Sequence, residues 1–119
     1  MATKKAKKEK AVPEPFWNEL VAVYFDFCRT HLGDEPTFDG SAPRDMKAII
    51  KTLHDRANTS GIEWTLEIAQ YRFHNFLSFA FQDSWLAKNW LLSNINRQKD
   101  KIFFNIRAAI KRQPADPFE

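Results

Sequence analysis

Apolar residues recur at helical spacing along most of the sequence, and the longest such stretch runs from Ile62 to Phe81. Five of its polar residues follow one another at steps of three and four, so they share one narrow stripe of a helix. These residues are Glu63, Glu67, Gln70, His74 and Ser78. A helix that is apolar over the rest of its circumference must be covered by neighbours on several sides. We therefore predict that residues 62–81 form the central, aromatic-rich helix of a small bundle.

Two segments before the central helix have the same periodicity. The first is predicted from Pro15 to His31, because proline is tolerated in a first helical turn and Gly33 follows as a stop signal. The second follows a loop rich in Pro, Asp and Gly, with Ser41 as its candidate N-cap and Pro43 in its first turn. The residues from Asn58 to Gly61 are expected to end it and to cap the central helix.

After Gln82 the pattern predicts a short helix capped by Asp83 or Ser84, followed by a longer one capped by Ser93. On a helical wheel, the long segment places its apolar residues on one side, and its cations lie opposite within an arc of about 140°. The cations are Arg97, Lys101, Arg107, Lys111 and Arg112. Lys99 falls on the apolar side, so either this helix begins later or the Lys99 side chain extends along the surface to reach water.

The composition favours a single all-α domain. The chain has 119 residues, 44% hydrophobic content and only 3 glycines, which is enough apolar material for one core and too little turn chemistry for a sheet. We predict a bundle of four or five helices over residues 13–112. Residues 1–12 lack core-forming side chains and are expected to be a disordered Lys-rich tail, and residues 113–119 an irregular one.

The net charge of +3 is concentrated at the two ends of the chain. Five lysines and one glutamate give the first ten residues a charge of +4, and the lysines are Lys4, Lys5, Lys7, Lys8 and Lys10. Six cations against Asp100 give the segment from Arg97 to Arg112 a charge of +5. Such basic clusters attract polyanions by counterion release, so we expect both to bind nucleic acid. A tail that only improves solubility is the alternative for the first cluster.

Phe104 stands out because the same wheel places it inside the basic arc, between Lys101 and Arg107. An aromatic ring among cations is typical of surfaces that bind single-stranded nucleic acid, where bases stack on the ring. It is equally typical of an anchor in a protein interface, a role for which Trp90 is a second candidate. Packing of Phe104 against the N-terminal helix is the third interpretation.

Arg72 and Asn75 interrupt the apolar character of the central helix. If neighbouring helices cover them, both must be paired or hydrogen-bonded, because an unpaired buried charge is costly. Two interpretations are open, namely a satisfied polar contact at a helix junction and a contact to a ligand or partner.

Motifs for catalysis or for a cofactor do not occur in the sequence. It contains no Gly-rich phosphate loop, no CxxC and no histidine pair at metal-ligand spacing, and its carboxylates are scattered. Cys28 is the only cysteine and is expected to be buried and unreactive. No apolar run is long enough to span a membrane. We expect a non-enzymatic cytoplasmic protein without cofactor or metal.

Three stretches resemble small helical modules of phage and mobile-element replication proteins. They are DSWLAKNWLLSNINRQKDKI at 83–102, FHNFLSFAF at 73–81 and FDGSAPRDMKAI at 38–49. This group includes C-terminal parts of replisome organisers and helicase-loader accessory proteins of the DnaD type. The resemblance implies an all-helical, non-catalytic module that contacts DNA or a replication protein such as a helicase.

Two functional hypotheses follow from these patterns. The first is an accessory module that binds nucleic acid in phage or mobile-element DNA replication, using the Lys-rich arm and the basic face of the last helix. The second is a helical protein-interaction module whose exposed aromatic anchor is Phe104 or Trp90.

Overall fold

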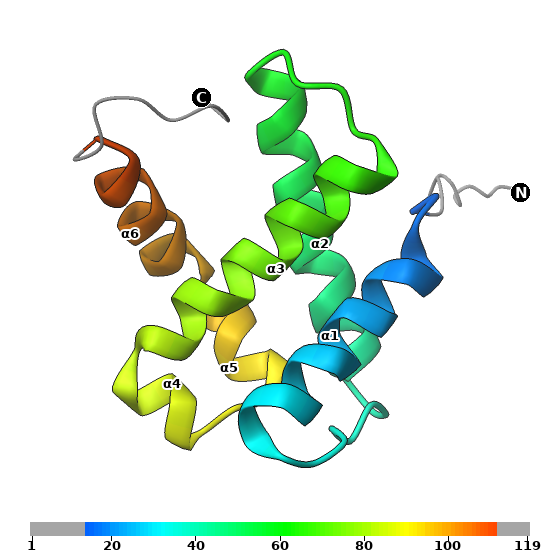
Figure 1. Ribbon diagram of the computed structural model, residues 1–119, viewed down its shortest axis with the longest axis vertical. Coiled ribbons are helices and arrows are strands. Elements are labelled where there is room, and N and C mark those ends of the chain that lie inside the picture. Colours follow the sequence, from blue (N-terminus) through cyan, green and yellow to red (C-terminus); the bar gives the residue numbers. More distant parts are fainter. Residues whose placement is uncertain (1–13, 112–119) are drawn as a thin grey trace, which may run out of the picture.

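The computed structural model describes residues 14–111, apart from the side chain of Lys111, and these residues form six α-helices and no strand (Figure 1). The prediction of an all-α domain is confirmed. The helices are α1 (Trp17–Leu32), α2 (Ala42–Thr59), α3 (Leu66–Gln82), α4 (Ser84–Lys88), α5 (Leu92–Arg97) and α6 (Lys99–Lys111). The two predicted tails, residues 1–12 and 113–119, lie outside the described residues.

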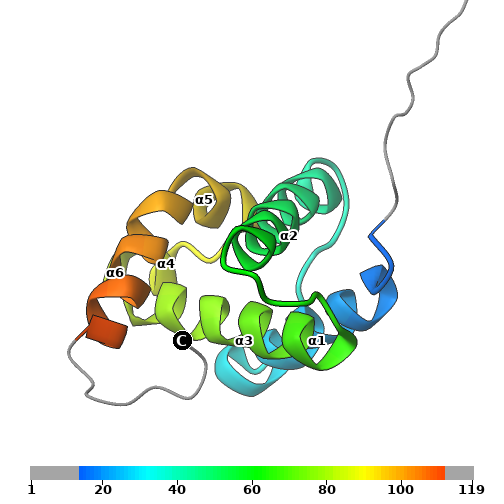
Figure 2. The ribbon, with the colours of Figure 1, turned by 90° about the horizontal axis from the view of Figure 1, so that it is seen from above.

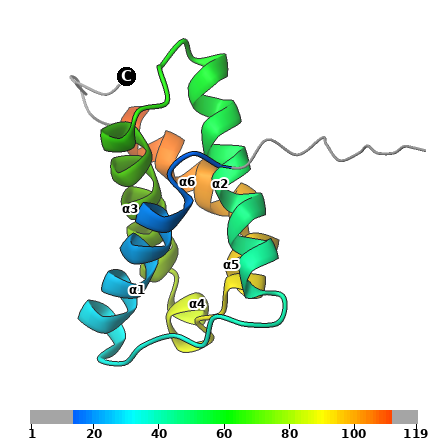
Figure 3. The same ribbon diagram turned by 90° about the vertical axis from the view of Figure 1, so that its right-hand side faces the viewer.

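The central position predicted for the third helix is confirmed, since α3 contacts α1, α2, α4 and α6. Its fully buried side chains Phe73, Phe76 and Leu77 form the middle of the core. Figure 2 shows α3 passing between α1 on one side and α6 on the other. Figure 3 shows α1 and α3 in one layer and α2 and α5 in a second. The part of the chain that the structure describes has no helix long and apolar enough to cross a membrane.

The start predicted for the central helix at Ile62 is wrong. Residues 62–65 are not helical, and α3 begins at Leu66. Its N-cap is Thr65, whose hydroxyl accepts a hydrogen bond from the backbone N–H of Ile68 at 3.2 Å. The cap therefore comes from Thr65 and not from the residues between Asn58 and Gly61.

The stretch before α3 is held by Glu14, at the beginning of the described chain. The Glu14 carboxylate, only 8% exposed, accepts the indole N–H of Trp64 at 2.9 Å and the backbone N–H of Phe16 at 3.3 Å. The ring of His54 stacks on Trp64 at 4.7 Å, and its Nδ1 lies 3.6 Å from Glu14 Oε1. These contacts join the start of α1, the end of α2 and the α2–α3 link.

The residue predicted to end α1 and the residue predicted to cap the start of α2 differ in what the structure shows. Gly33, at φ 77°, ends α1 and donates its N–H to the Arg29 carbonyl at 3.1 Å, as its position predicted. Ser41 occupies the N-cap position of α2, as predicted, but its hydroxyl makes no capping hydrogen bond. The first turn of α2 is thus formed without that contribution to its stability.

The last predicted helix is two helices, which explains why the bundle has six in the described residues instead of four or five. The backbone at Gln98, at φ −101° and ψ 9°, separates α5 from α6. Lys99 is the first residue of α6, and its Nζ donates to Asn96 Oδ1 at 3.2 Å. The helix therefore begins later than predicted, but Lys99 still belongs to it and is half-buried. Ser93 lies inside α5, whose N-cap is Leu91, so the predicted Ser93 cap is wrong.

Candidate nucleic-acid interface

Arg56 of α2 lies over the Phe103 ring of α6, and it is near enough to one arginine of α3 and one of α6 for their charges to act on it. Arg56 lies in the last turn of α2, Arg72 in α3 and Arg107 in α6. Partial burial, and then the positive charges of Arg107 and Arg72, lower the pKa of Arg56. An arginine nevertheless keeps its charge at neutral pH, so three positive charges share this region. We call Arg56, Arg72 and Arg107 the arginine cluster.

The position of Arg56 is set by the hydrophobic core. Its guanidinium carbon lies 4.4 Å from the centroid of the Phe103 ring, within the range of a cation–π interaction. Phe103 is buried and packs against Phe76 at a centroid distance of 5.1 Å. The charged group of Arg56 is therefore supported by two buried aromatic rings.

Carboxylates contribute little to the neutralisation of the arginine cluster. Among the described residues, none lies within ion-pair distance of Arg56, Arg72 or Arg107. Asp100 raises the pKa of Arg56, but this effect is smaller than those of burial and of the two neighbouring arginines. Like charges held together repel one another, so an anion placed among them would relieve the repulsion.

The sequence indicated only part of this cluster. Arg107 belongs to the predicted basic face, and Arg72 interrupts the apolar character of the predicted central helix. Arg56 was missed because its partners Arg72 and Phe103 lie on other helices. Arg72 and Asn75 are both half-buried, so the surrounding helices cover them only in part.

Phe104 is the most exposed large apolar side chain of the described residues, at 63%. The interpretation that it packs against the N-terminal helix is therefore wrong, and α1 lies on the other side of α3 from α6 (Figure 2). Lys101 and Arg107 are each one helical turn away from Phe104 on α6. The ring is thus presented to solvent beside the arginine cluster.

Lys101 is already engaged in an ion pair. Its Nζ lies 2.9 Å from Asp83 Oδ2, while Asp83 Oδ1 accepts the backbone N–H of Leu86 at 3.0 Å as the N-cap of α4. Lys101, and then the Leu86 N–H, lower the pKa of Asp83. The charge of Lys101 is therefore neutralised locally, unlike that of Arg107.

The other predicted basic residues are not brought to this surface as one face. Arg97 belongs to α5 and donates to Asn94 Oδ1 at 3.3 Å, so the break at Gln98 removes it from the wheel of α6. Of Lys111 only the backbone is described. Arg112 and the tail residues Lys4, Lys5, Lys7, Lys8 and Lys10 lie outside the described residues.

Trp90 is packed into an aromatic cluster. It is half-buried, stacks on Phe27 at 5.6 Å and meets Phe81 edge-on at 5.3 Å. The exposed apolar side chains of this region are instead Trp85 and Leu91, at 48% and 59%. Trp90 is consequently a core side chain and not an exposed anchor.

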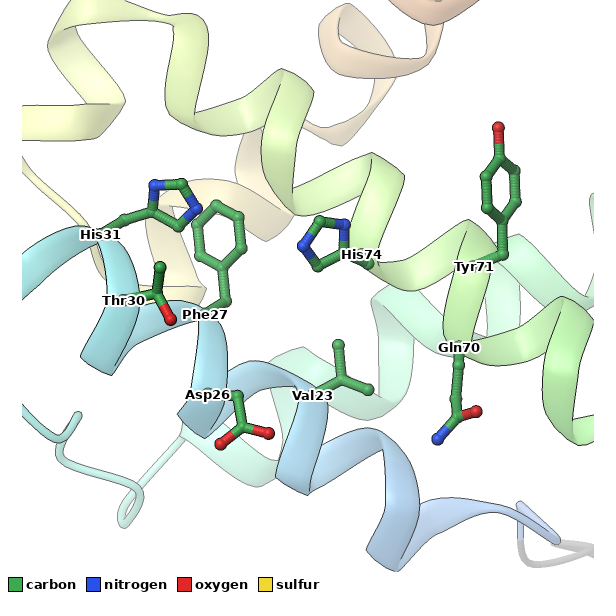
Figure 4. Close-up of a pocket in the computed structure, with 8 residues that line it drawn as sticks. All are labelled: Val23, Asp26, Phe27, Thr30, His31, Gln70, Tyr71 and His74. Carbon is green, nitrogen blue, oxygen red and sulfur yellow. The ribbon is translucent and has the colours of Figure 1, made fainter.

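A shallow groove of about 410 Å³ lies between α1 and α3 (Figure 4), lined by Val23, Asp26, Phe27, Thr30, His31, Gln70, Tyr71 and His74. Figure 4 shows the two imidazole rings on either side of Phe27, whose ring lies 4.2 Å from His31 and 5.7 Å from His74. Asp26 is engaged by Arg29, which also pairs with Glu35 at 3.1 Å. The described residues contain no group of three His, Cys, Asp or Glu that could hold a metal ion. This groove therefore offers aromatic packing and no metal site.

The thiol of Cys28 is fully buried, as predicted. Burial raises its pKa, and the opposing effects of the Trp90 indole and the Tyr24 hydroxyl are smaller. Burial also raises the pKa of Tyr24 far above its ordinary value. Such a thiol is a poor nucleophile, since the reactive form is the thiolate.

Comparisons of this chain with protein-family models, with curated proteins and with solved structures find no match. The resemblance to replication modules therefore stays a prediction from the sequence. The strongest structural indication of function is the arginine cluster with the exposed ring of Phe104 beside it.

Proposed function

We propose that this chain is a non-catalytic module that binds the phosphate backbone of nucleic acid through the arginine cluster. The observation that carries the proposal is the position of Arg56 over Phe103 of α6 at 4.4 Å, where the charges of Arg72 and Arg107 act on it and no carboxylate of the described residues is ion-paired with any of the three. Guanidinium groups suit phosphate because their planar donors match its oxygens. Neutralising phosphates also releases condensed counterions, which favours binding at low salt.

The fixed position of Arg56 in the free protein also supports the proposed binding of phosphate. The ring of Phe103 holds Arg56 in place before any ligand arrives, so less side-chain entropy is lost on binding. The repulsion of Arg56 by Arg72 and Arg107 is relieved when a polyanion binds. Both effects make the free energy of binding more favourable than a set of separate surface lysines would.

The Lys-rich segment adds a second positive region in this proposal. The described chain starts at Glu14, on the side of the domain opposite α6 (Figures 1 and 2). The arm and the arginine cluster would therefore engage different parts of one polyanion. The proposed setting is cytoplasmic replication of a phage or mobile element, which is supported by the resemblance of residues 38–49 and 73–102 to such modules.

The proposal is tested by titrating labelled oligonucleotides with the full chain at two salt concentrations and following fluorescence anisotropy. Arg72→Gln and Arg107→Gln should each weaken binding and reduce the slope of log affinity against log salt by about 1, the value for one lost phosphate contact. Arg44→Gln removes the same charge from the exposed first turn of α2, outside the cluster, and should change the slope little.

Two results would contradict the proposal. One is that the double variant Arg72→Gln, Arg107→Gln binds like the unaltered chain at low salt. The other is that deletion of residues 1–12 abolishes all binding, which would assign the activity to the arm alone. Retained, salt-sensitive binding by the shortened chain supports the arginine cluster.

A second candidate function is a protein-interaction module, which is favoured by the exposed Trp85 and Leu91 around α4. Neither residue belongs to the arginine cluster. In that case Trp85→Ala should weaken association with a protein partner, such as a replicative helicase, while nucleic-acid binding is unaffected.

A further inference from the structure

We infer that the nucleic acid bound by this surface is single-stranded, with a base stacked on Phe104 and the adjoining phosphates on the arginine cluster. This inference rests on the function proposed above and specifies its ligand. The starting observation is that two consecutive aromatic residues of α6 have opposite environments. Phe103 is 6% exposed and supports Arg56, whereas Phe104 is 63% exposed.

Helix geometry places the exposed ring next to the cations. Successive residues of a helix are about 100° apart, so Phe104 leaves the core on the flank next to Phe103. Arg107 is one turn from both rings, four residues after Phe103 and three after Phe104. Arg107 therefore links the arginine cluster to the exposed ring along one continuous strip of surface.

The opposite flank of Phe104 has a different chemistry. A recess of about 270 Å³ lies there between α3 and α6, lined by Phe79, Gln82, Asp83, Asn105 and Ala108. The amides of Gln82 and Asn105 offer both donors and acceptors, which suit the edge of a base. Asp83 repels phosphate and already neutralises Lys101. The strip thus has one flank on which the arginine cluster outweighs the single charge of Asp100, and a neutral-to-acidic flank for bases, with the aromatic ring between them.

This layout distinguishes single strands from duplexes. In a duplex the bases are stacked on one another and cannot lie on a side chain, so a duplex can use only the arginines. An unpaired strand can use the arginines and the ring together. Stacking on an aromatic side chain is tolerant of sequence, because every base has a π-face.

A protein partner fits the same surface less well. Among the described residues of α6, Phe104 is the only large apolar side chain that is exposed, and its neighbours one turn away are Asp100, Lys101, Arg107 and Ala108. Anchors of protein interfaces are usually enclosed by other contacts that exclude water. An isolated ring among charges matches a base more closely than it matches an apolar pocket.

The test compares a thymidine oligonucleotide with a blunt-ended duplex of two short strands carrying the same total number of phosphates, each titrated with the full chain. The unaltered chain should bind the single strand more tightly. Phe104→Ala should lower affinity for the single strand about tenfold, which is within the range for one stacked base, and leave both duplex affinity and the salt slope unchanged. Phe104→Trp should retain the preference. Trp85→Ala, which removes a comparably exposed aromatic from α4, is the matched control and should change neither affinity.

The outcomes separate this inference from the proposed function. Equal affinity of the unaltered chain for both ligands, or an equal loss on both in Phe104→Ala, would overturn the single-strand inference. Weakened binding by Arg72→Gln and Arg107→Gln would still support the arginine cluster in that case. If the arginine variants bind like the unaltered chain, the proposed function fails, and with it the inference built on it.

Discussion

The guanidinium carbon of Arg56 lies 4.4 Å from the centroid of the Phe103 ring, although the two residues come from α2 and α6. This contact joins a charged surface group to the hydrophobic core. A change in the core can therefore alter the charged surface, and the two effects can be measured separately.

The first prediction concerns Phe103→Leu. The substitution keeps an apolar side chain but removes the cation–π contact with Arg56 and the ring contact with Phe76. Each contact contributes about 0.5–2 kcal/mol, so we expect the free energy of unfolding to fall by about 1–3 kcal/mol in urea titrations. Phe104→Leu, at the neighbouring exposed position, should change it by no more than about 0.5 kcal/mol. Equal losses of stability in the two variants would contradict the conclusion that Phe103, and not Phe104, makes stabilising contacts with Arg56 and Phe76.

The second prediction concerns the ion pair between Asp83 and Lys101. Asp83→Asn keeps an N-cap for α4, because asparagine caps as well as aspartate, but it frees the charge of Lys101. We expect tighter binding of oligonucleotides and a salt slope larger by about 1, because one more cation can neutralise a phosphate.

Asp26→Asn is the control for this variant. It removes the same negative charge from α1, on the other side of α3 from α6, where Asp26 pairs with Arg29. Its effect on the salt slope should be smaller. If Asp26→Asn and Asp83→Asn raise affinity equally, the increase reflects net charge alone and Lys101 has no local role.

The third prediction compares two N-cap residues. Thr65→Ala removes the hydroxyl that accepts the Ile68 N–H and should lower the free energy of unfolding by about 1 kcal/mol. Ser41→Ala removes a hydroxyl that makes no capping hydrogen bond and should stay within about 0.5 kcal/mol. Thermal or urea unfolding followed by circular dichroism measures both. A loss of more than about 0.5 kcal/mol in Ser41→Ala would show that the Ser41 hydroxyl caps α2 in solution.

The fourth prediction concerns alkaline pH. Burial raises the pKa of Cys28 above its ordinary value of 9.0 and that of Tyr24 above 10.0. As the pH rises past these ordinary values, the unfolded chain loses both protons while the folded chain keeps them. The contribution of these two groups to the free energy of unfolding should therefore be constant below pH 9.0. Above pH 9.0 it should decrease.

Urea titrations across this range test the alkaline decrease. In Cys28→Ala the decrease should begin only near 10.0, where Tyr24 becomes the remaining contributor. A free energy of unfolding that stays level through both values in the unaltered chain would mean that the buried thiol and phenol reach solvent in the folded state.

The apolar spacing was sufficient to predict the helices and the central position of α3. Ile49 in α2 and Phe73 in α3 each belong to a stripe of apolar residues at steps of three and four, and such a stripe is stable only when it is buried. The break at Gln98 was not predictable in the same way, because no proline or glycine marks it. It is accompanied by a tertiary contact, in which Asn96 Nδ2 donates to Asp45 Oδ1 on α2 at 3.1 Å.

The candidate site was predicted only where one helix carries it. The wheel of α6 brought Phe104 and Arg107 together correctly, since both lie within one turn. It could not show that Asp83 neutralises Lys101, nor that Arg56 and Arg72 complete the charged region, because these residues come from other helices. Contacts between distant parts of the chain decide which cations remain free to bind a phosphate.

The carboxylate of Glu14 has a practical consequence for handling this protein. By holding the Trp64 indole and the Phe16 amide, it fixes where the chain enters the domain, and that point faces away from α6 in Figures 1 and 2. A molecule attached to a sensor chip or bead through its amino end would therefore leave the Phe104 strip facing the flowing solution. Attachment at Lys111, where the described chain ends, would instead place the support on α6 itself and crowd the ligand.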